Sequence, residues 1–310
     1  MDPSLASALQ AWKLETEFRD GERHHKVLSG VERWVEEKHL GNGTFGCVYQ
    51  ERCVSGPSAS AVRAVKQILK YQSKLSHREL QALTTFSDAR VPEYQNHFVR
   101  CLGWFEDKDK LYIAMEFIQH GDLHGYIRRG ILPEPEAAAI TAQVAQALRF
   151  MHQKGFVHRD LKPLVGFLSC NILVSRPAPD WHVKVADFGA TKNMDGTKLG
   201  THGIGTNGYV APEQLDDSLA DSYSPSVDIF ALGAIVFCMC TGSPPFRSPG
   251  PLFAYVRDSS LFPIGDLDEL TGLCSKFVLR AMAARASERA TIDELLTHRW
   301  LLKHSGGNKG

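Results

Sequence analysis

A chain of 310 residues is long enough for one large domain or for two lobes that share a cleft. Its hydrophobic residues (43%) and charged residues (23%) stand in ordinary globular proportion, which excludes wholesale disorder. Lys plus Arg and Asp plus Glu number 35 each, so the net charge gives no sign of a nucleic-acid partner or an anionic membrane surface.

Residues 1–33 are predicted to form an extension, partly helical or flexible, that precedes the main domain. Pro3 favours the start of a short helix, with Leu9 and Trp12 on one of its faces. The charged run at 19–25 contains no alternation of apolar and polar residues, and we interpret it as a solvated loop.

From about Trp34 the pattern changes to that of short β-strands. A helical stretch at about 74–84 interrupts these strands. The β-rich runs are separated by glycines or charged turns and end near Tyr49, Lys66, Phe105 and Phe117. This part of the chain, about 34–117, therefore predicts a small antiparallel β-sheet lobe with one helix.

Beyond the strands the pattern is helical. Residues 133–152 carry apolar side chains at three- and four-residue spacing, as a core-facing helix does. The run 230–240 is apolar all round and predicts a helix buried on every side. A last amphipathic helix is expected at 291–302, before a flexible tail at 303–310. The prediction is a larger, mainly helical lobe at about 121–302.

A glycine-rich segment from Gly41 to Val48 fits the pattern G-x-G-x-x-G-x-V. Glycines let a backbone approach phosphate oxygens, because no Cβ intervenes. A dinucleotide-binding loop needs a helix directly after the glycines, whereas residues 47–51 indicate a second strand. The segment therefore predicts the tip of a hairpin that covers phosphates.

A strand that ends at Lys66 follows the hairpin, at the position from which a lysine would pair the α- and β-phosphates of a nucleotide. Such a lysine needs an acidic partner. Glu79 is the only acidic residue of the helical stretch between Lys74 and Phe86, and it is the candidate. A solvated strand lysine and a surface carboxylate remain the alternatives for this pair.

The triplet His158-Arg159-Asp160 is the next motif, and with it the chain resembles the eukaryotic protein kinases over about 34–302. The matching motifs arrive in the expected order: the glycine-rich loop, Ala64-Val65-Lys66, Glu79, His158-Arg159-Asp160, Asp187-Phe188-Gly189, Ala211-Pro212-Glu213 and Asp228. A fixed order of motifs is far more specific than any one motif. The resemblance implies an α+β, bilobal protein-kinase fold with the ATP cleft between its lobes.

The resemblance also implies the reaction, which is transfer of the γ-phosphate of ATP to protein Ser or Thr hydroxyls. Asp160 would accept the proton of the hydroxyl, and Lys162 would offset charge on the transferring group. A lysine at that position favours a Ser/Thr enzyme over a tyrosine kinase. Asp187 and Asn171 would hold Mg²⁺ ions that bridge the phosphates.

By the same resemblance, residues 111–118 form the strand and hinge that hold adenine. Met115 would lie at the back of the pocket, and the backbone of Glu116 and Ile118 would bond the purine edge. Asp122 could reach the ribose. The nucleotide would also contact Leu40, Gly41, Asn42, Gly43, Thr44, Phe45, Gly46, Val48, Ala64, Lys66 and Leu173.

The segment 187–213 resembles an activation segment, in which Thr197 and Thr201 are the candidate phosphorylation sites. The resemblance makes Glu213 and Arg289 a buried ion pair of the large lobe. Asp228 is expected to anchor the backbone of the catalytic loop. The Gly-Asp-Leu after the hinge and the sequence Thr-Gly-Ser-Pro-Pro-Phe lean toward the calcium/calmodulin-dependent kinases.

The catalytic loop departs from the family pattern H-R-D-x-x-x-x-N, which has four residues between Asp and Asn. Here ten residues separate Asp160 from Asn171, and the excess of six falls at 164–169. One explanation is a genuine insertion that bulges outward. The other, which we favour, is that a pyrimidine-rich stretch before a splice acceptor has been translated as Phe-Leu-Ser-Cys at 167–170. The insertion leaves a pseudokinase or nucleotide-binding scaffold as the alternative function.

Cysteine usage and the apolar pattern bear on the compartment. The seven cysteines are scattered without C-x-x-C spacing, which predicts reduced thiols. The N-terminus lacks the features of a signal peptide, and the longest apolar run falls short of the roughly 20 residues that span a bilayer. We expect a cytoplasmic or nuclear protein whose partners are ATP and protein substrates, without nucleic acid or membrane.

Overall fold

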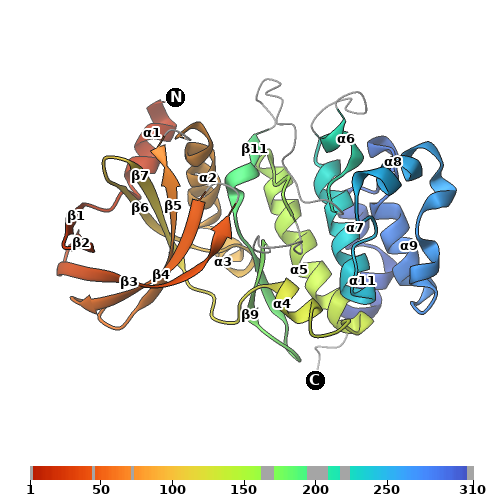
Figure 1. The fold of residues 1–310 in the computed structure, drawn as a ribbon, viewed down its shortest axis with the longest axis horizontal. Helices are drawn as coiled ribbons and strands as arrows, with labels where there is room; N and C mark the ends of the chain where they lie inside the picture. Colours follow the sequence, from red (N-terminus) through yellow and green to blue (C-terminus); the bar gives the residue numbers. More distant parts are fainter. Residues whose placement is uncertain are drawn as a thin grey trace. The chain divides into compact units, whose positions relative to one another are not determined.

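The computed structural model describes residues 3–43, 46–70, 73–161, 171–193, 209–216 and 224–305 (Figure 1). These residues divide into two units. The first, called the N-terminal unit below, comprises 3–119 and 187–189. The second, the C-terminal unit, comprises the remaining described residues.

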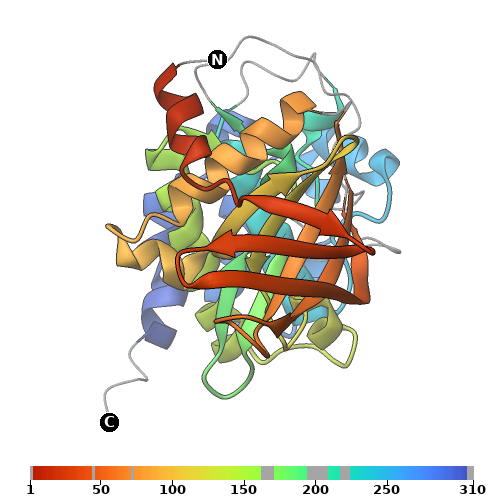
Figure 2. The same cartoon turned by 90° about the vertical axis from the view of Figure 1, so that its left-hand side faces the viewer.

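The N-terminal unit is built on an antiparallel sheet of seven described strands in the order β1-β2-β3-β4-β5-β7-β6. The strands are β1 (Thr16–Arg19), β2 (Glu22–Val27), β3 (Gly30–Gly43), β4 (Gly46–Ser55), β5 (Val62–Leu69), β6 (Cys101–Glu106) and β7 (Lys110–Glu116). Figure 2 shows β1, β2 and β3 crossing in front of the later strands. The sheet therefore has one face that these first strands cover.

Three helices accompany the sheet within the described part of the unit: α1 (Pro3–Gln10), α2 (Ser73–Phe86) and α3 (Pro92–His97). The short helix expected at the start of the chain is α1, and the helix expected at 74–84 is α2. Figures 1 and 2 both place α1 beside α2, and the two helices are in contact.

The interpretation of 19–25 as a solvated loop is wrong, because β1 and β2 form a hairpin that pairs with β3. The inward-facing positions of β2 are Arg23 and His25, which are both buried. Polar residues on the inner face hide the alternation that identifies a half-buried strand. They are tolerated there because buried polar partners lie opposite them.

The C-terminal unit is mainly helical. Its helices are α4 (Leu123–Ile127), α5 (Glu134–Gln153), α6 (Pro212–Leu215), α7 (Ser226–Thr241), α8 (Pro249–Arg257), α9 (Gly272–Ala281), α10 (Ile292–Leu296) and α11 (Arg299–Ser305). Its short strands are β8 (Phe156–Val157), β9 (Ile172–Arg176), β10 (His182–Val185) and β11 (Lys192–Asn193). Along the described ranges, no helix combines the length and apolar character that a bilayer crossing requires.

The core of the C-terminal unit surrounds α7. Every residue of this helix from Val227 to Cys240 is buried, as the apolar run at 230–240 predicted. The helices α5 and α9 pack against it. Burial on all sides explains why α7 shows no polar stripe.

The single helix expected at 291–302 is instead two helices, α10 and α11. His298 lies between them, and its Nδ1 accepts the N–H of Trp300 at 3.3 Å, in the manner of a helix cap. The turn lets the fully buried Trp300 donate its indole N–H to Glu134 at 3.0 Å. The amphipathic pattern continues across both helices, which is why the sequence did not reveal the break.

Candidate active site

The glycine-rich segment is a hairpin, as the sequence predicted. Strands β3 and β4 pair up to its tip, with Gly41 opposite Val48 and Gly43 opposite Gly46. A Cβ on Gly46 would lie 2.0 Å from the carbonyl oxygen of Gln67, so only glycine fits there. The prediction for the tip residues Thr44 and Phe45 lies outside the described residues.

Lys66 lies on β5 and is buried in the N-terminal unit. Its side chain is 2% exposed, and its Nζ donates to Glu79 Oε1 at 2.6 Å and to Asp187 Oδ1 at 2.7 Å. The pair of Lys66 with Glu79 was expected from the sequence, and the structure brings the two together. The contact with Asp187, which is 121 residues away, carried no separate signal.

The charges in this cluster shift the pKa of each partner. Burial alone would lower the pKa of Lys66, but the carboxylates of Asp187 and Glu79 outweigh it and hold that pKa above its ordinary value. Burial and the charge of Asp187 raise the pKa of Glu79 to about 7, against the opposing effect of Lys66. Lys66 therefore stays protonated between Glu79 and Asp187.

Asp187 and Phe188 are consecutive residues held in different surroundings. Asp187 has a φ of 56°, a strained value for a residue other than glycine, and its Oδ1 also accepts the N–H of Gly189 at 3.2 Å. Phe188 is fully buried and stacks on Phe86 of α2, with ring centroids 5.8 Å apart. The strained backbone turns the carboxylate toward Lys66 while the ring joins the aromatic core.

The strand register places several expected nucleotide contacts on one face of the sheet. Val48 lies opposite Lys66, and Ala64 lies opposite Met115. Residues directly opposite in an antiparallel pair share a face, as do residues two apart in one strand. Val48, Ala64, Lys66 and Met115 therefore line the same face, the one against which α2 packs through Glu79.

The catalytic loop in the C-terminal unit is anchored by Asp228, as expected. Its carboxylate accepts the backbone N–H of His158 at 2.9 Å and that of Arg159 at 2.8 Å. It also contacts Nε2 of His152 at 2.9 Å, a partner that sequence reasoning missed. Burial works to raise the pKa of Asp228, but these bonds and the nearby histidines hold it below its ordinary range.

Asn171 returns to the catalytic loop despite the extra residues before it. Its Nδ2 donates to the carbonyl oxygen of Asp160 at 2.6 Å, and Asn171 is 1% exposed. The backbone of Asn171 is fixed in turn by the N–H of Ala186, which donates to its carbonyl at 2.9 Å. The two residues that the long loop separates are therefore neighbours.

Two further expected contacts have other partners in the structure. Asp122 caps α4, accepting the N–H of Gly125 at 2.9 Å, and it forms a β-bridge with Leu173. The N–H of Glu116 donates to the carbonyl of Arg100 at 3.0 Å. The roles expected for Asp122 at a ribose and for Glu116 at a purine stay predictions.

The buried ion pair of the C-terminal unit is present, since Arg289 Nη2 lies 2.8 Å from Glu213 Oε2. Other expectations lie outside the described residues: those for Lys162, for Thr197 and Thr201, and for the insertion at 164–169.

Comparison with known proteins agrees with this geometry. Residues 34–301 match the protein kinase domain, so the chain belongs to the protein kinase family. It is a Ser/Thr protein kinase, and it is similar to calcium/calmodulin-dependent protein kinases. Human "Calcium/calmodulin-dependent protein kinase type 1B" is 30% identical over 284 residues, which cover 90% of this chain and 77% of that protein.

Two other relatives show the breadth of the similarity. The "Calcium/calmodulin-dependent protein kinase cmkA" of Emericella nidulans is 30% identical, over 91% of this chain and 67% of its own length. "Aurora kinase B" of Drosophila melanogaster is 29% identical, over 85% of this chain and 75% of its own length. As a protein kinase, the chain takes ATP and protein as its substrates.

Proposed function

We propose that this chain catalyses Mg²⁺-dependent transfer of the γ-phosphate of ATP to Ser or Thr hydroxyls, with Asp160 as the catalytic base. The observation that carries the proposal is the hydrogen bond from Asn171 to Asp160. The insertion was the one feature that favoured a nucleotide-binding scaffold, and this contact shows that Asn171 nevertheless lies beside the catalytic loop.

Each side chain has a separate task in the proposed reaction. Asp160 accepts the proton of the attacking hydroxyl, and its backbone is held by Asn171 and by the N–H bond to His158 Nδ1. Lys66, kept cationic by its carboxylate partners, binds the α- and β-phosphates of ATP. Because Glu79 fixes the lysine in advance, little reorganisation is needed when ATP binds.

Mg²⁺ fits the donor atoms present, because it prefers oxygen ligands and is usually held by one or two protein groups together with substrate phosphates. Asp187 would supply its carboxylate, oriented by Lys66 and by the N–H of Gly189. Asn171 uses its amide N–H₂ on Asp160, so its amide oxygen is the atom that would bind a cation. A bound ion would offset negative charge on the phosphates.

The proposed adenine contacts follow from the strand register. Ala64 and Met115 lie opposite each other on the face that also carries Lys66. Since the N–H of Glu116 is used by Arg100, its carbonyl is the group that would accept from the purine amine. The backbone of Ile118 would supply the second hydrogen bond.

The test is transfer of labelled γ-phosphate from Mg-ATP to a generic basic protein. The 310-residue chain is assayed beside a chain that lacks 164–169, and Lys66→Met serves as the blank. We expect transfer well above the blank, because the cluster that binds phosphate and the catalytic loop are each assembled.

The paired chains separate the possible results. Equal rates mean that the insertion is a tolerated surface bulge. Transfer by the trimmed chain alone means that residues 164–169 are foreign to the working enzyme and that the proposed function belongs to the trimmed chain. If neither exceeds the blank, including after phosphorylation of Thr197 or Thr201, the proposal is overturned in favour of the scaffold.

A further inference from the structure

The N-terminal segment, defined here as residues 3–27, precedes the part of the chain that matches the protein kinase domain. The proposed reaction uses none of its side chains. Yet it is packed into the N-terminal unit, where it covers one face of the sheet, contacts α2 through α1, and contributes the buried residues Leu9, Arg23 and His25. The role of so closely packed a segment needs an explanation.

The first anchor of this segment is α1, which contacts α2. Leu9 of α1 is 4% exposed, and its carbonyl accepts the indole N–H of Trp104 at 2.8 Å. Lys13, just beyond the helix, lies over the ring of Trp104 at 4.9 Å and pairs with Glu106 at 2.7 Å. These contacts hold α1 between β6 and the helix that carries Glu79.

The second anchor closes the open edge of the sheet. Leu14 donates its N–H to the carbonyl of Trp104 at 2.7 Å, and Trp104 donates to the carbonyl of Trp12 at 3.0 Å. Gly103 makes this approach possible, since its φ is +135° and a Cβ there would lie 2.7 Å from the Leu14 side chain. Residues 12–15 thus join β6 to β2, which bonds Glu15 through the N–H of Lys26 at 2.9 Å.

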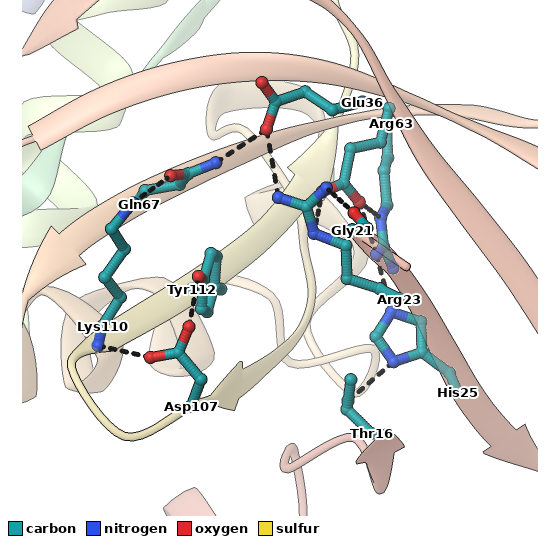
Figure 3. A network of polar contacts seen from close by, with 11 residues as sticks. Thr16, Gly21, Arg23, His25, Glu36, Arg63, Gln67, Asp107, Lys110 and Tyr112 are labelled. Atoms are coloured by element: carbon teal, nitrogen blue, oxygen red, sulfur yellow. Dashed lines mark hydrogen bonds and ion pairs between the residues drawn. The ribbon is translucent and has the colours of Figure 1, made fainter. Parts of the chain in front are cut away.

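A third anchor runs through the interior, as Figure 3 shows. Thr16 donates its hydroxyl to the carbonyl of Leu14 and accepts from Nδ1 of His25 at 2.7 Å. Arg63 of β5 donates to Nε2 of the same ring at 2.6 Å and to Glu51 at 2.6 Å. Because Nε2 accepts this hydrogen bond from Arg63, the ring must be the neutral tautomer with its proton on Nδ1. The segment is therefore hydrogen-bonded to β5.

These anchors converge on the two elements that form the phosphate-binding pair. Arg63 and Lys66 lie on opposite faces of β5, three residues apart, so fixing one fixes the backbone of the other. The helix that α1 contacts is α2, which carries Glu79. We propose that residues 3–27 are an intramolecular positioning element that keeps Lys66 and Glu79 in contact before ATP binds. This inference rests on the proposed function, in which Lys66 binds the phosphates of ATP.

The test removes α1 and leaves the contacts of residues 12–27. A chain that lacks residues 1–11 keeps residues 12–15 on the sheet edge. We expect hydrogen exchange of the α2 amides to become faster while β4 and β5 stay protected. We also expect ATP to bind about tenfold more weakly, which corresponds to the Lys66–Glu79 contact being formed in about a tenth of the molecules. Binding is measured with Mg-ATP by calorimetry, independently of phosphate transfer.

Point variants separate positioning from general stability. Leu9→Ser should reproduce the deletion, and Leu9→Met should keep the ATP affinity of the unaltered chain, because methionine fills the same buried site. Leu28→Ser is the matched control, since Leu28 lies in the exposed turn after β2 and should change neither readout. Both readouts work for a chain without transferase activity, so the proposal can fail or stand separately from the proposed function.

The contrary results are specific. Unchanged α2 exchange and unchanged ATP affinity in the deleted chain overturn the proposal, because α1 is the part of the segment that contacts the helix carrying Glu79. Equal loss of protection in α2, β4 and β5 also overturns it, since that pattern means that the segment stabilises the whole unit without positioning α2.

Discussion

The proposed activity depends on Asn171, which holds the backbone of Asp160. We expect Asn171→Ala to lower kcat about 10–100-fold and to raise the Mg²⁺ concentration that gives half-maximal rate. The reason is that the variant loses both the donor that holds the Asp160 carbonyl and the proposed oxygen ligand. Steady-state rates over a Mg²⁺ series measure both effects.

The control is Asn96→Ala, on the exposed side of α3, which should leave both quantities unchanged. A wild-type rate for Asn171→Ala at every Mg²⁺ concentration would contradict the assignment. It would show that the amide serves neither the loop nor the cation.

His25 gives a pH dependence that can be worked out with its sign. Burial, with the charges of Arg63, Arg23 and His24, lowers the pKa of His25 to about 3. In the unfolded chain the ring titrates near its ordinary value of about 6.5, so the unfolded state binds a proton that the folded state excludes. This contribution to stability is complete above pH 6.5 and is lost as the pH falls toward 3.

Between pH 7 and pH 5 the free energy of unfolding should therefore fall by about 1–2 kcal/mol on account of this one ring. Urea titrations at several pH values measure it. His25→Gln is the comparison, because a glutamine amide can accept from Arg63 and donate to Thr16 without titrating. The same slope in the variant and the wild type would assign the pH dependence to other groups.

At the scale of elements, the ion pair of Glu213 and Arg289 joins the start of α6 to the turn before α10. Arg289 also donates to the carbonyls of Ala283, Ala284 and Ser226. Arg289→Ala leaves a buried carboxylate without its cation, which we expect to cost about 3–5 kcal/mol of unfolding free energy. Chemical denaturation of the variant measures the loss.

The matched control for this loss is Arg285→Ala, four residues earlier. Arg285 pairs with Glu288 on the surface, where its side chain is 80% exposed. An exposed pair contributes only about 0–1 kcal/mol, so this variant should unfold nearly as the wild type does. Comparable losses in the two variants would mean that burial of the Glu213 pair adds nothing.

The elements also show what a sequence can reveal. The hairpin at the glycines, α2, α5 and α7 were all predictable, because each has one consistent periodicity. The hairpin of β1 and β2 was not, because its inner positions are Arg23 and His25. Alternation of apolar and polar residues identifies a strand only where its buried face is apolar.

The site divides in the same way. Lys66 and Glu79 were predictable as a pair, because one helix offered one acidic residue. The contact of Lys66 with Asp187 and that of Asn171 with Asp160 depend on how distant segments return to each other. The spacing alone cast doubt on whether Asn171 reaches the catalytic loop. A loop of unusual length can still end at the usual place, because the extra residues add only a modest entropic cost.

At the scale of the whole N-terminal unit, the two faces of the sheet carry different sets of side chains. One face carries Lys66 and the expected nucleotide contacts. The other carries Val65, Phe105 and Tyr112, which form a buried cluster against which Leu14 packs. In this chain the second face is covered by β1 and β2, so it forms a second core that the kinase domain alone does not supply.

Removal of residues 1–29, unlike removal of α1 alone, should therefore destabilise the unit. The deletion uncovers Phe105 and Tyr112 and removes the partner of Arg63 at His25. Two large side chains returned to water account for about 3–6 kcal/mol, and the exposed patch favours aggregation. Urea denaturation and light scattering measure the two effects. If the shortened chain unfolds at the same urea concentration as the full chain and scatters no more light, the second core contributes no stability and the segment only lies on the sheet.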